Sequence, residues 1–302
     1  MVEEKTVLTV SSSRKNDALT WGQDGFSIQG VEGNFRTLKI EEDEAISSDW
    51  KVKQDSSLTE YLDSYVYGQS ISPTSSIYKL FAIYVKSMVH DLNGPEQLNV
   101  LDVGCGIGKN HPSYIDLLAD KVNYLGLDAI DIHPNRDYPF ICSRIETMSE
   151  FSSFHKKMDA FIFGTSLDHF ENYEDVSKMI NKMATPGAIS IFWIGLHDVP
   201  LVAGEEGVRI FQRIFEDEGP LTVMGHFLKF VFLRFPRLFY ALQRRRKRLK
   251  NNTNLDEFHF NYFRVKDLPE VLSCFGEIID ITMIPVTTSV FCTCQQPSNL
   301  TT

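Results

Sequence analysis

A glycine-rich turn that follows an apolar run is the feature of this sequence that most limits its fold. The run covers residues 98–103, LNVLDV, and leads into Gly104, Gly106 and Gly108, spaced G-x-G-x-G. Such a run predicts a buried strand. Because glycines lack a Cβ atom, they adopt positive φ and let backbone amides approach a ligand, and the N-terminus of a following helix adds partial positive charge. The pattern predicts a strand and a turn that holds a ligand.

The spacing of the glycines and the position of one acid indicate the kind of ligand. A turn that binds a dinucleotide has the spacing G-x-G-x-x-G, with its acid near the end of the second strand. Here the third glycine comes one residue earlier, and Asp102 lies two residues before Gly104. An acid in that place suits an ammonium group better than a pyrophosphate. The motif resembles motif I of the class I S-adenosylmethionine (SAM) methyltransferases.

Further landmarks of that family follow in order within residues 75–295. Residues 123–128 resemble the second strand and end in Asp128, and in the family such an acid accepts both ribose hydroxyls. Residues 139–142, 158–164 and 188–194 resemble the third, fourth and fifth strands. The resemblance is to the small-molecule and sugar methyltransferases, type 11-like. It implies a doubly wound, Rossmann-like α/β fold with a seven-stranded, mostly parallel sheet whose last strand is antiparallel.

The resemblance also implies the cofactor, SAM, and roles for residues at the ends of these strands. Ile145 is implied to pack on the adenine, although Arg144 stands where the family commonly has an acid. His169 is open between lining the pocket and capping the next helix. Cys105 is interpreted as a small filler of the loop, because nothing near it in the sequence would lower its thiol pKa. The implied cofactor-binding residues are Asp102, Gly104, Cys105, Gly106, Gly108, Asp128, Ala129, Ile145, Gly164 and Thr165.

Composition excludes some partners and indicates a compartment. The chain has 302 residues, 43% of them hydrophobic, which is enough to bury a sizeable core. The net charge of −10 argues against general nucleic-acid binding, because phosphate contacts need a basic surface. The five cysteines form no C-x-x-C pair and no ligand spacing with histidine, so we expect no metal site. The acidic N-terminus lacks the apolar stretch of a secretory signal, and a cytoplasmic protein with reduced thiols is expected.

The first 58 residues are organised differently from residues 59–302, the expected methyltransferase domain. Short strand-like runs at 7–10, 18–21, 25–28 and 35–40 predict a small β meander, followed by a charged, Ser-rich linker. Some bacterial methyltransferases carry a zinc ribbon at this position, but its cysteine ligands are missing here. The extension is therefore expected to be a metal-free cap or a homodimerisation element. An apolar stripe at helical spacing, Ile77, Leu80, Phe81, Tyr84, Val85 and Met88, predicts a helix over 75–92.

A helical insertion, residues 196–261, separates the fifth strand from the last ones and is expected to select the methyl acceptor. Residues 227–240 are dense in aromatics, and six of the seven residues 244–250 are basic. Three basic residues and Pro236 interrupt the apolar run, so it does not span a bilayer. Two interpretations stay open: a lid over the acceptor pocket, or a peripheral membrane contact of residues 227–250 with anionic lipid. The two are compatible if the acceptor is lipid-linked.

The segment after the insertion carries a candidate catalytic base. Residues 256–263, DEFHFNYF, resemble the acid-x-x-His stretch of many small-molecule and sugar methyltransferases, where the histidine faces the acceptor. His259, with His169 as the second candidate, is suited to removing a proton from an acceptor, because imidazole titrates near neutral pH. The alternative is a structural histidine held by backbone partners. A helix at 265–274 and an antiparallel hairpin of 277–284 with 289–294 are expected to complete the fold.

The sequence thus predicts an enzyme that transfers a methyl group from SAM to an O or N nucleophile of a small molecule, a sugar or a lipid-linked acceptor. Placing donor and acceptor in line supplies most of such a rate. Two other classes stay open. One is a non-catalytic scaffold that keeps the fold, and the other is a nucleotide-dependent oxidoreductase, which the glycine spacing opposes.

Overall fold

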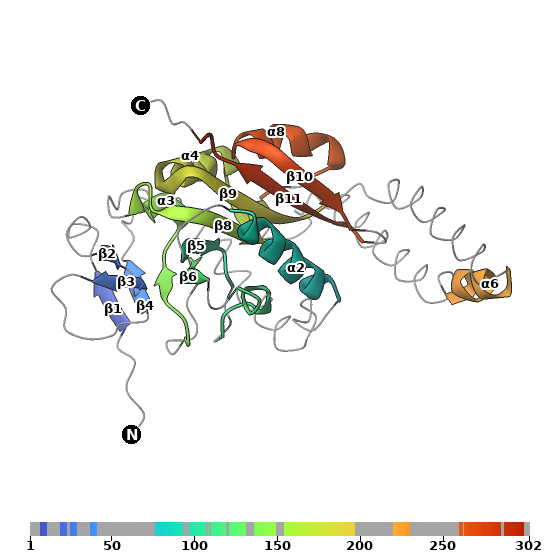
Figure 1. Cartoon of the computed structure of the whole chain (residues 1–302), viewed down its shortest axis with the longest axis horizontal. Helices are drawn as coiled ribbons and strands as arrows, with labels where there is room; N and C mark the ends of the chain where they lie inside the picture. The colour runs from blue at the N-terminus through green and yellow to red at the C-terminus, as the bar shows by residue number, and fades with distance from the viewer. Residues whose placement is uncertain are drawn as a thin grey trace, which may run out of the picture.

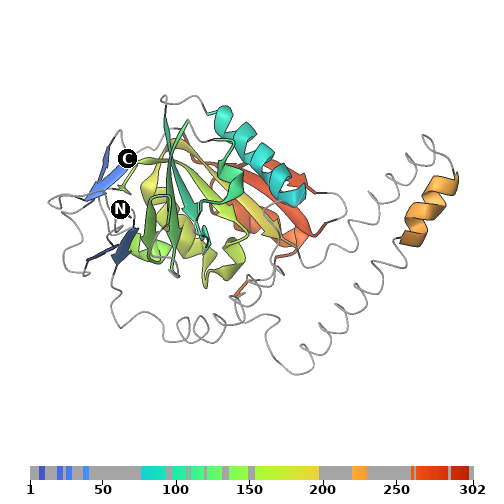
Figure 2. The ribbon, with the colours of Figure 1, turned by 90° about the horizontal axis from the view of Figure 1, so that it is seen from below.

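The protein is built around one mixed β-sheet with helices on both faces (Figure 1). Helix α2 (Ser76–His90) lies on one face, and α3 (Ile145–Met148), α4 (Tyr173–Met183) and α8 (Leu268–Ser273) lie on the other, as the turned view also shows (Figure 2). The computed structural model describes residues 7–10, 19–22, 25–28, 37–40, 76–92, 97–106, 108, 110–118, 121–130, 136–148, 154–196, 220–229, 260–261, 263–284 and 287–298.

The sheet has the strand order β1-β4-β7-β6-β5-β8-β9-β11-β10. Its last seven members are β7 (Phe140–Cys142), β6 (Val122–Asp128), β5 (Leu98–Val103), β8 (Met158–Gly164), β9 (Ala184–Gly195), β11 (Ser289–Gln295) and β10 (Glu277–Met283). The five strands from β7 to β9 in this order are parallel to one another, whereas β11 is antiparallel to both β9 and β10. This confirms the predicted seven-stranded sheet with an antiparallel last strand.

The N-terminal strands extend this sheet instead of forming a meander of their own. Strand β4 (Thr37–Ile40) pairs in parallel with β7, and β1 (Val7–Val10) pairs in parallel with β4. Only β2 (Leu19–Gly22) and β3 (Gly25–Ile28) form the expected antiparallel hairpin. The predicted meander was therefore wrong for two of the four strands. The reason is that β7 would otherwise be an edge strand with unpaired backbone groups, and β4 supplies the partners.

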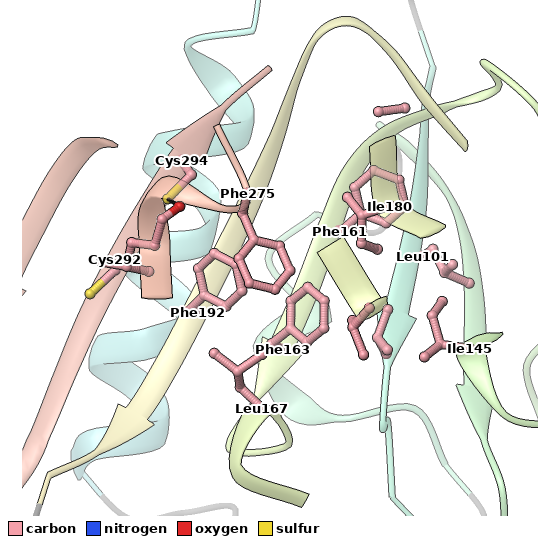
Figure 3. Packing of buried hydrophobic residues seen from close by; sticks show 14 of the residues in the cluster. Leu101, Ile145, Phe161, Phe163, Leu167, Ile180, Phe192, Phe275, Cys292 and Cys294 are labelled. Atoms are coloured by element: carbon pink, nitrogen blue, oxygen red, sulfur yellow. Dashed lines mark hydrogen bonds between the residues drawn. The ribbon is translucent and has the colours of Figure 1, made fainter. Parts of the chain in front are cut away.

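Alternating residues of the sheet build two separate cores. Leu101 faces the layer of α4 and α8, where the rings of Phe163, Phe192 and Phe275 pack together with centroids 4.8 Å and 4.9 Å apart (Figure 3). Its neighbour Val100 faces α2 and the second core. Cys292 and Cys294 are buried free thiols of the first core, as core packing requires (Figure 3). Because side chains alternate along a strand, Asp102 points to the α2 side of the sheet.

Helix α2 packs the members of the predicted stripe against the sheet, except Leu80. Phe81, Val85 and Val89 are buried against the sheet, one turn apart. Leu80, which was predicted to belong to the stripe, is exposed, and so is Ile83. Positions 80 and 81 lie about 100° apart around a helix. Because the buried line passes through position 81, position 80 turns toward solvent.

The insertion begins and ends at neighbouring points of the sheet. Strand β9 ends at Gly195, and the next residue, Leu196, forms a parallel bridge with Phe263. Between these residues the structure describes helix α6 (Pro220–Lys229), which lies apart from the helices that cover the sheet in both views (Figures 1 and 2). The predicted helical insertion thus contains a helix, and its base is closed by the Leu196–Phe263 bridge.

Candidate functional site

The candidate site lies at the carboxyl ends of β5, β6 and β8, where the strand order reverses. Strands β6 and β7 lie on one side of β5, and β8 and β9 lie on the other. In open α/β sheets the connections diverge at such a point and leave a crevice that binds ligands. The glycine loop after β5, Asp128 at the end of β6 and Thr165 after β8 all lie at this edge.

Two glycines of the loop have positive φ for different reasons. Gly104 has φ +72°, and a Cβ atom there would lie 2.4 Å from Cβ of Ser166. Gly106 has φ +85°, but a Cβ atom there would meet nothing within 4 Å. The first glycine is therefore required by packing between β5 and β8. The second leaves open space on the outer side of the loop, as close approach of a ligand to backbone requires.

Asp128 holds the loop through its carboxylate. Its Oδ2 accepts a hydrogen bond from the Gly106 amide at 2.9 Å, and its Oδ1 accepts one from the Ile130 amide at 3.0 Å. Burial raises the pKa of Asp128, while these amides and the positive charge of Arg136 oppose the shift. Each carboxylate oxygen has two lone pairs, so both keep an acceptor site. Ala129 follows at the same edge, where its carbonyl lies 3.7 Å from Sγ of Cys142.

Asp102 is a buried carboxylate with an uneven set of partners. The residue is 0% exposed, and its Oδ2 accepts hydrogen bonds from the hydroxyls of Tyr114 and Tyr124, each at 2.8 Å. Its Oδ1 is also buried, and no described residue donates a hydrogen bond to it. Burial raises the pKa of Asp102 to about 7, although the two tyrosine hydroxyls oppose the shift. A cationic group of a ligand nearby would favour the ionised form.

Arg136 supports the loop from inside the protein. It is 0% exposed, and its Nη1 donates to the carbonyls of Gly106 at 2.9 Å and Gly108 at 3.0 Å. Its guanidinium carbon lies 3.6 Å from the ring centroid of Phe140. Arg136 also donates to the hydroxyl of Tyr138, which donates to the Gly108 carbonyl at 3.2 Å. The carbonyls of the loop are therefore fixed by a buried cation and a tyrosine.

Cys105 fills space in the loop and is not an activated thiol. It is buried, and its Sγ lies 3.7 Å from the hydroxyl of Tyr138. Burial and the nearby carboxylates Asp102 and Asp128 raise the pKa of the Cys105 thiol well above its usual value. Because the thiolate is the reactive form, this environment suits a filler residue.

The segment after β8 is closely packed and strained. Thr165 has φ +68°, a conformation that is a genuine outlier for a β-branched residue, and such strain clusters at functional sites. Its amide donates to the carbonyls of Phe163 at 3.0 Å and Trp193 at 3.2 Å. Gly164 lies against Tyr114, whose hydroxyl would be 2.7 Å from a Cβ atom at that position. Thr165 is thus held at the edge where the resemblance places a cofactor contact.

His169 lies at the same edge of the sheet, in the short helix Leu167–His169 that follows β8. Its Nε2 is 3.6 Å from Asp168 Oδ1, and its charge opposes the rise in the pKa of Asp128. His259 lies outside the described residues. The next two residues, Phe260 and Asn261, donate their amides to the Asp168 carbonyl at 2.9 Å and 3.1 Å. The chain that returns from the insertion therefore docks beside His169.

Ile145 is the implied cofactor contact that the packing supports least. It is 1% exposed and belongs to the core under α3, so its side chain packs against other core residues. Its neighbour Arg144 forms ion pairs with Glu146 at 3.1 Å and Glu171 at 3.8 Å. The arginine that replaces the family's acid thus has acidic partners of its own.

Sequence reasoning missed the residues that support the site from within. These are Tyr114, Tyr124, Arg136 and Tyr138. A signal existed for Tyr124: it lies on the strand that pairs with the strand of Asp102, in the register Val100↔Tyr124, and a buried acid requires donors. For Tyr114 and Arg136 we see no local pattern, because their contacts arise only when distant segments pack together.

Comparison with known proteins supports the fold assignment. No family model matches the sequence, and a search of the curated proteins finds no match. Among solved structures, 1,6-didemethyltoxoflavin-N1-methyltransferase of Burkholderia thailandensis, with bound 1,6-didemethyltoxoflavin and S-adenosylhomocysteine (SAH), matches with TM-score 0.51 and 12% identity. The match covers 85% of this chain and 93% of that chain. Strand order and this match show that the chain has the class I methyltransferase fold, as predicted.

Two further solved structures match over most of their length. The plantazolicin methyltransferase BpumL in complex with SAH matches with TM-score 0.49 and 12% identity, over 82% of this chain and 95% of that one. The PH0226 protein of Pyrococcus horikoshii OT3 matches with TM-score 0.48 and 16% identity, over 79% of this chain and 98% of that one.

Proposed function

We propose that the protein is a SAM-dependent methyltransferase. One observation carries the proposal: a Cβ atom at Gly106 would meet nothing within 4 Å, while the Gly106 amide donates to the Asp128 carboxylate at the end of the next strand. A glycine turn beside a strand-end carboxylate suits an adenosyl ligand whose ribose hydroxyls need an acceptor. The toxoflavin methyltransferase, whose fold this chain shares, was crystallised with SAH.

Different residues at the carboxyl edge of the sheet would bind different parts of SAM. Asp128 would accept the ribose hydroxyls through its free lone pairs, and the Gly104–Gly108 loop would lie against the ligand. Asp102 would favour the cationic end of the ligand, since its buried Oδ1 accepts no hydrogen bond from any described residue. Gly164, Thr165 and Ala129 would line the strand ends. When bound, SAM supplies an electrophilic methyl group on a sulfonium sulfur.

The acceptor is proposed to be an O or N nucleophile of a small molecule, a sugar or a lipid-linked compound. A lone pair of the nucleophile forms the bond to the methyl carbon as the carbon–sulfur bond breaks, and that electron pair stays on sulfur. The proton of the nucleophile goes to a histidine, for which His169 and His259 are the candidates. We favour His169, because its short helix Leu167–His169 directly follows β8 at the carboxyl edge of the sheet.

Isothermal calorimetry with SAM, SAH and NADH tests the proposal. We expect binding of SAH in the micromolar range common among enzymes, and at least a tenfold loss in Asp128→Ala, because the ribose hydroxyls lose their acceptor. Asp91→Ala is the matched control, since Asp91 is an exposed carboxylate at the end of α2. Preference for NADH would favour an oxidoreductase. Binding of none of the three ligands would favour a non-catalytic scaffold.

Two further features of the proposal concern location and assembly. We propose a cytoplasmic protein, with a homodimer and a peripheral membrane contact as the partner hypotheses. Within the part of the chain that the structure describes, no helix has both the length and the apolar character needed to cross a membrane. Sedimentation equilibrium of the whole chain tests the dimer, and a monomer at all concentrations would exclude it.

A further inference from the structure

Arg144 is a largely buried cation at the carboxyl edge of the sheet, where it holds two acids from different segments. Its side chain is 10% exposed, and its Nη2 lies 3.1 Å from Glu146 Oε1 and 3.8 Å from Glu171 Oε2. Arg144 and Glu146 follow β7, whereas Glu171 follows the short helix Leu167–His169 after β8. Because a guanidinium loses hydration when it is buried, it needs such partners. The cluster joins the ends of two strands that are not neighbours in the sheet.

The order of the strands indicates which part of SAM would lie beside Arg144. In SAM the ribose carries the methionine chain on C5′ and the adenine on C1′, which lie on opposite sides of the ring. Strand β6 lies between β5 and β7, and Asp128 at its end is the proposed acceptor for the ribose hydroxyls. With the cationic end of the ligand at Asp102 on β5, the adenine points toward the residues that follow β7. This step rests on the proposed function.

Arg144 and Glu171 offer the two kinds of hydrogen-bonding group that the edge of adenine requires. Adenine presents a 6-amino donor beside a ring nitrogen that accepts. A guanidinium only donates, and an ionised carboxylate only accepts. Glu146 lies within hydrogen-bond distance of the guanidinium and orients it. Glu171 Oε2 is too far from Nη2 for a hydrogen bond, so this ion pair does not occupy a lone pair of Glu171.

We propose that Arg144 and Glu171 together select the adenine base of the cofactor. Arg144 donates to a ring nitrogen, and Glu171 accepts from the 6-amino group. Hypoxanthine, the 6-oxo analogue, has a carbonyl in place of that amino group, so two acceptors would face each other at Glu171. A site that hydrogen-bonds a group of its ligand rejects an analogue that lacks the group, because polar atoms of the site lose their partners. Ion pairs that only tied the two segments together would affect both bases alike.

Calorimetry of the full chain with SAH and with S-inosylhomocysteine, its hypoxanthine analogue, tests the proposal. We expect the wild type to bind SAH about tenfold to a hundredfold more tightly, as the loss of a hydrogen bond to a charged group predicts. Glu171→Gln keeps the shape of the side chain, but its carboxamide both donates and accepts. This variant should therefore lower the preference for SAH to less than about threefold.

Three further variants separate base selection from structure. Glu146→Gln removes a charge from the same guanidinium but should keep the preference for SAH. Arg144→Met should weaken SAH binding at least tenfold and still fold by circular dichroism, because Glu146 and Glu171 are 30% and 36% exposed and reach water. Lys178→Met is the control, since it breaks an exposed ion pair with Asp175 on α4. It should bind both ligands like the wild type.

Three results would overturn the proposal. The first is a wild type that binds the two ligands equally. The second is a preference that Glu171→Gln leaves unchanged or that Glu146→Gln abolishes instead. The third is a loss of affinity by the same factor for both ligands in Glu171→Gln, as expected of an ion pair that only supports the fold. A wild type that binds neither ligand would contradict the methyltransferase proposal and this one with it, so the two failures are distinguishable.

Discussion

The glycine loop after β5 and helix α6 differ in how far the fold accounts for their residues. In the loop, the packing explains the residue types: Gly104 touches Ser166, Gly106 binds Asp128, and the loop carbonyls bind a buried arginine. In α6, the described apolar side chains lie in solvent. Residues of the loop therefore serve folding and ligand binding together. Leu221, Met224 and Leu228 of α6 belong to neither of the two cores.

Two alanine variants of the loop sharpen this comparison most. One tests a glycine that packing requires, and the other tests a glycine beside the space expected for the ligand. Gly104→Ala should lower the free energy of unfolding by about 2–5 kcal/mol, since strain at positive φ adds to a clash with Ser166. Gly106→Ala should cost only the strain, about 1–2 kcal/mol, because no atom lies where its Cβ would be. Urea unfolding measures both, and calorimetry should show that Gly106→Ala, although folded, binds SAH much more weakly. Equal stability of the two variants would contradict the assignment.

Asp102 gives the stability of the protein a pH dependence. The folded state raises the pKa of Asp102 from 3.8 to about 7, so between these values it holds a proton that the unfolded chain has lost. Stability therefore falls as the pH rises from about 4 to about 7 and is constant above that, by up to about 4 kcal/mol at 1.36 kcal/mol per unit. Asp102→Asn should remove this dependence. Unfolding in urea across this pH range, wild type against variant, measures the difference, and parallel curves would show that Asp102 does not titrate in the window.

Arg136 tests whether the inner support of the loop matters for binding. Arg136→Met should destabilise the protein by about 1–3 kcal/mol, because the Gly106 carbonyl loses its arginine donor and the Gly108 carbonyl keeps only the Tyr138 hydroxyl. SAH affinity should fall at least tenfold, and Arg136→Lys should restore part of it. A general loss of packing would lower stability without this rescue. Recovery of affinity with the lysine variant is therefore the result that supports a positioning role.

The smallest effect is expected in α6. The Ser variant of Leu221, Met224 and Leu228 should change the free energy of unfolding by no more than about 0.5 kcal/mol, as is usual for exposed positions. Urea unfolding in the absence of lipid measures it. A loss as large as that of Gly104→Ala would mean that α6 packs on the domain, and the contrast between the two regions would disappear.

The sequence could predict what local rules decide. The strands at 98–103 and 158–164 were predicted at their observed bounds, because each is an apolar run ended by glycine. The loop was also predictable, because a single local pattern, the spacing of its glycines, marks it. The pairing of β4 with β7 could not be predicted, because it joins segments a hundred residues apart through backbone groups that leave no mark on residue type.

The buried contacts of Arg136 with the loop could not be predicted from the sequence for a related reason. Arg136 is charged and lies in a stretch that predicts a loop, yet it is fully buried, because the loop carbonyls and the Phe140 ring replace its water. Ile145 shows the reverse: an apolar residue in the place of an adenine contact is buried in the core. Apolar character alone does not separate these two roles.

A crystal structure of the protein with SAH tests the central claim most directly, namely that the glycine loop and Asp128 form a cofactor site. The account predicts the ribose hydroxyls within hydrogen-bond distance of the Asp128 carboxylate and the ligand against the outer side of Gly106. It also predicts that His169 lies at the edge of the site, near the sulfur that would carry the methyl group. SAH bound elsewhere, or a crevice at Gly106 closed by protein side chains, would contradict the account.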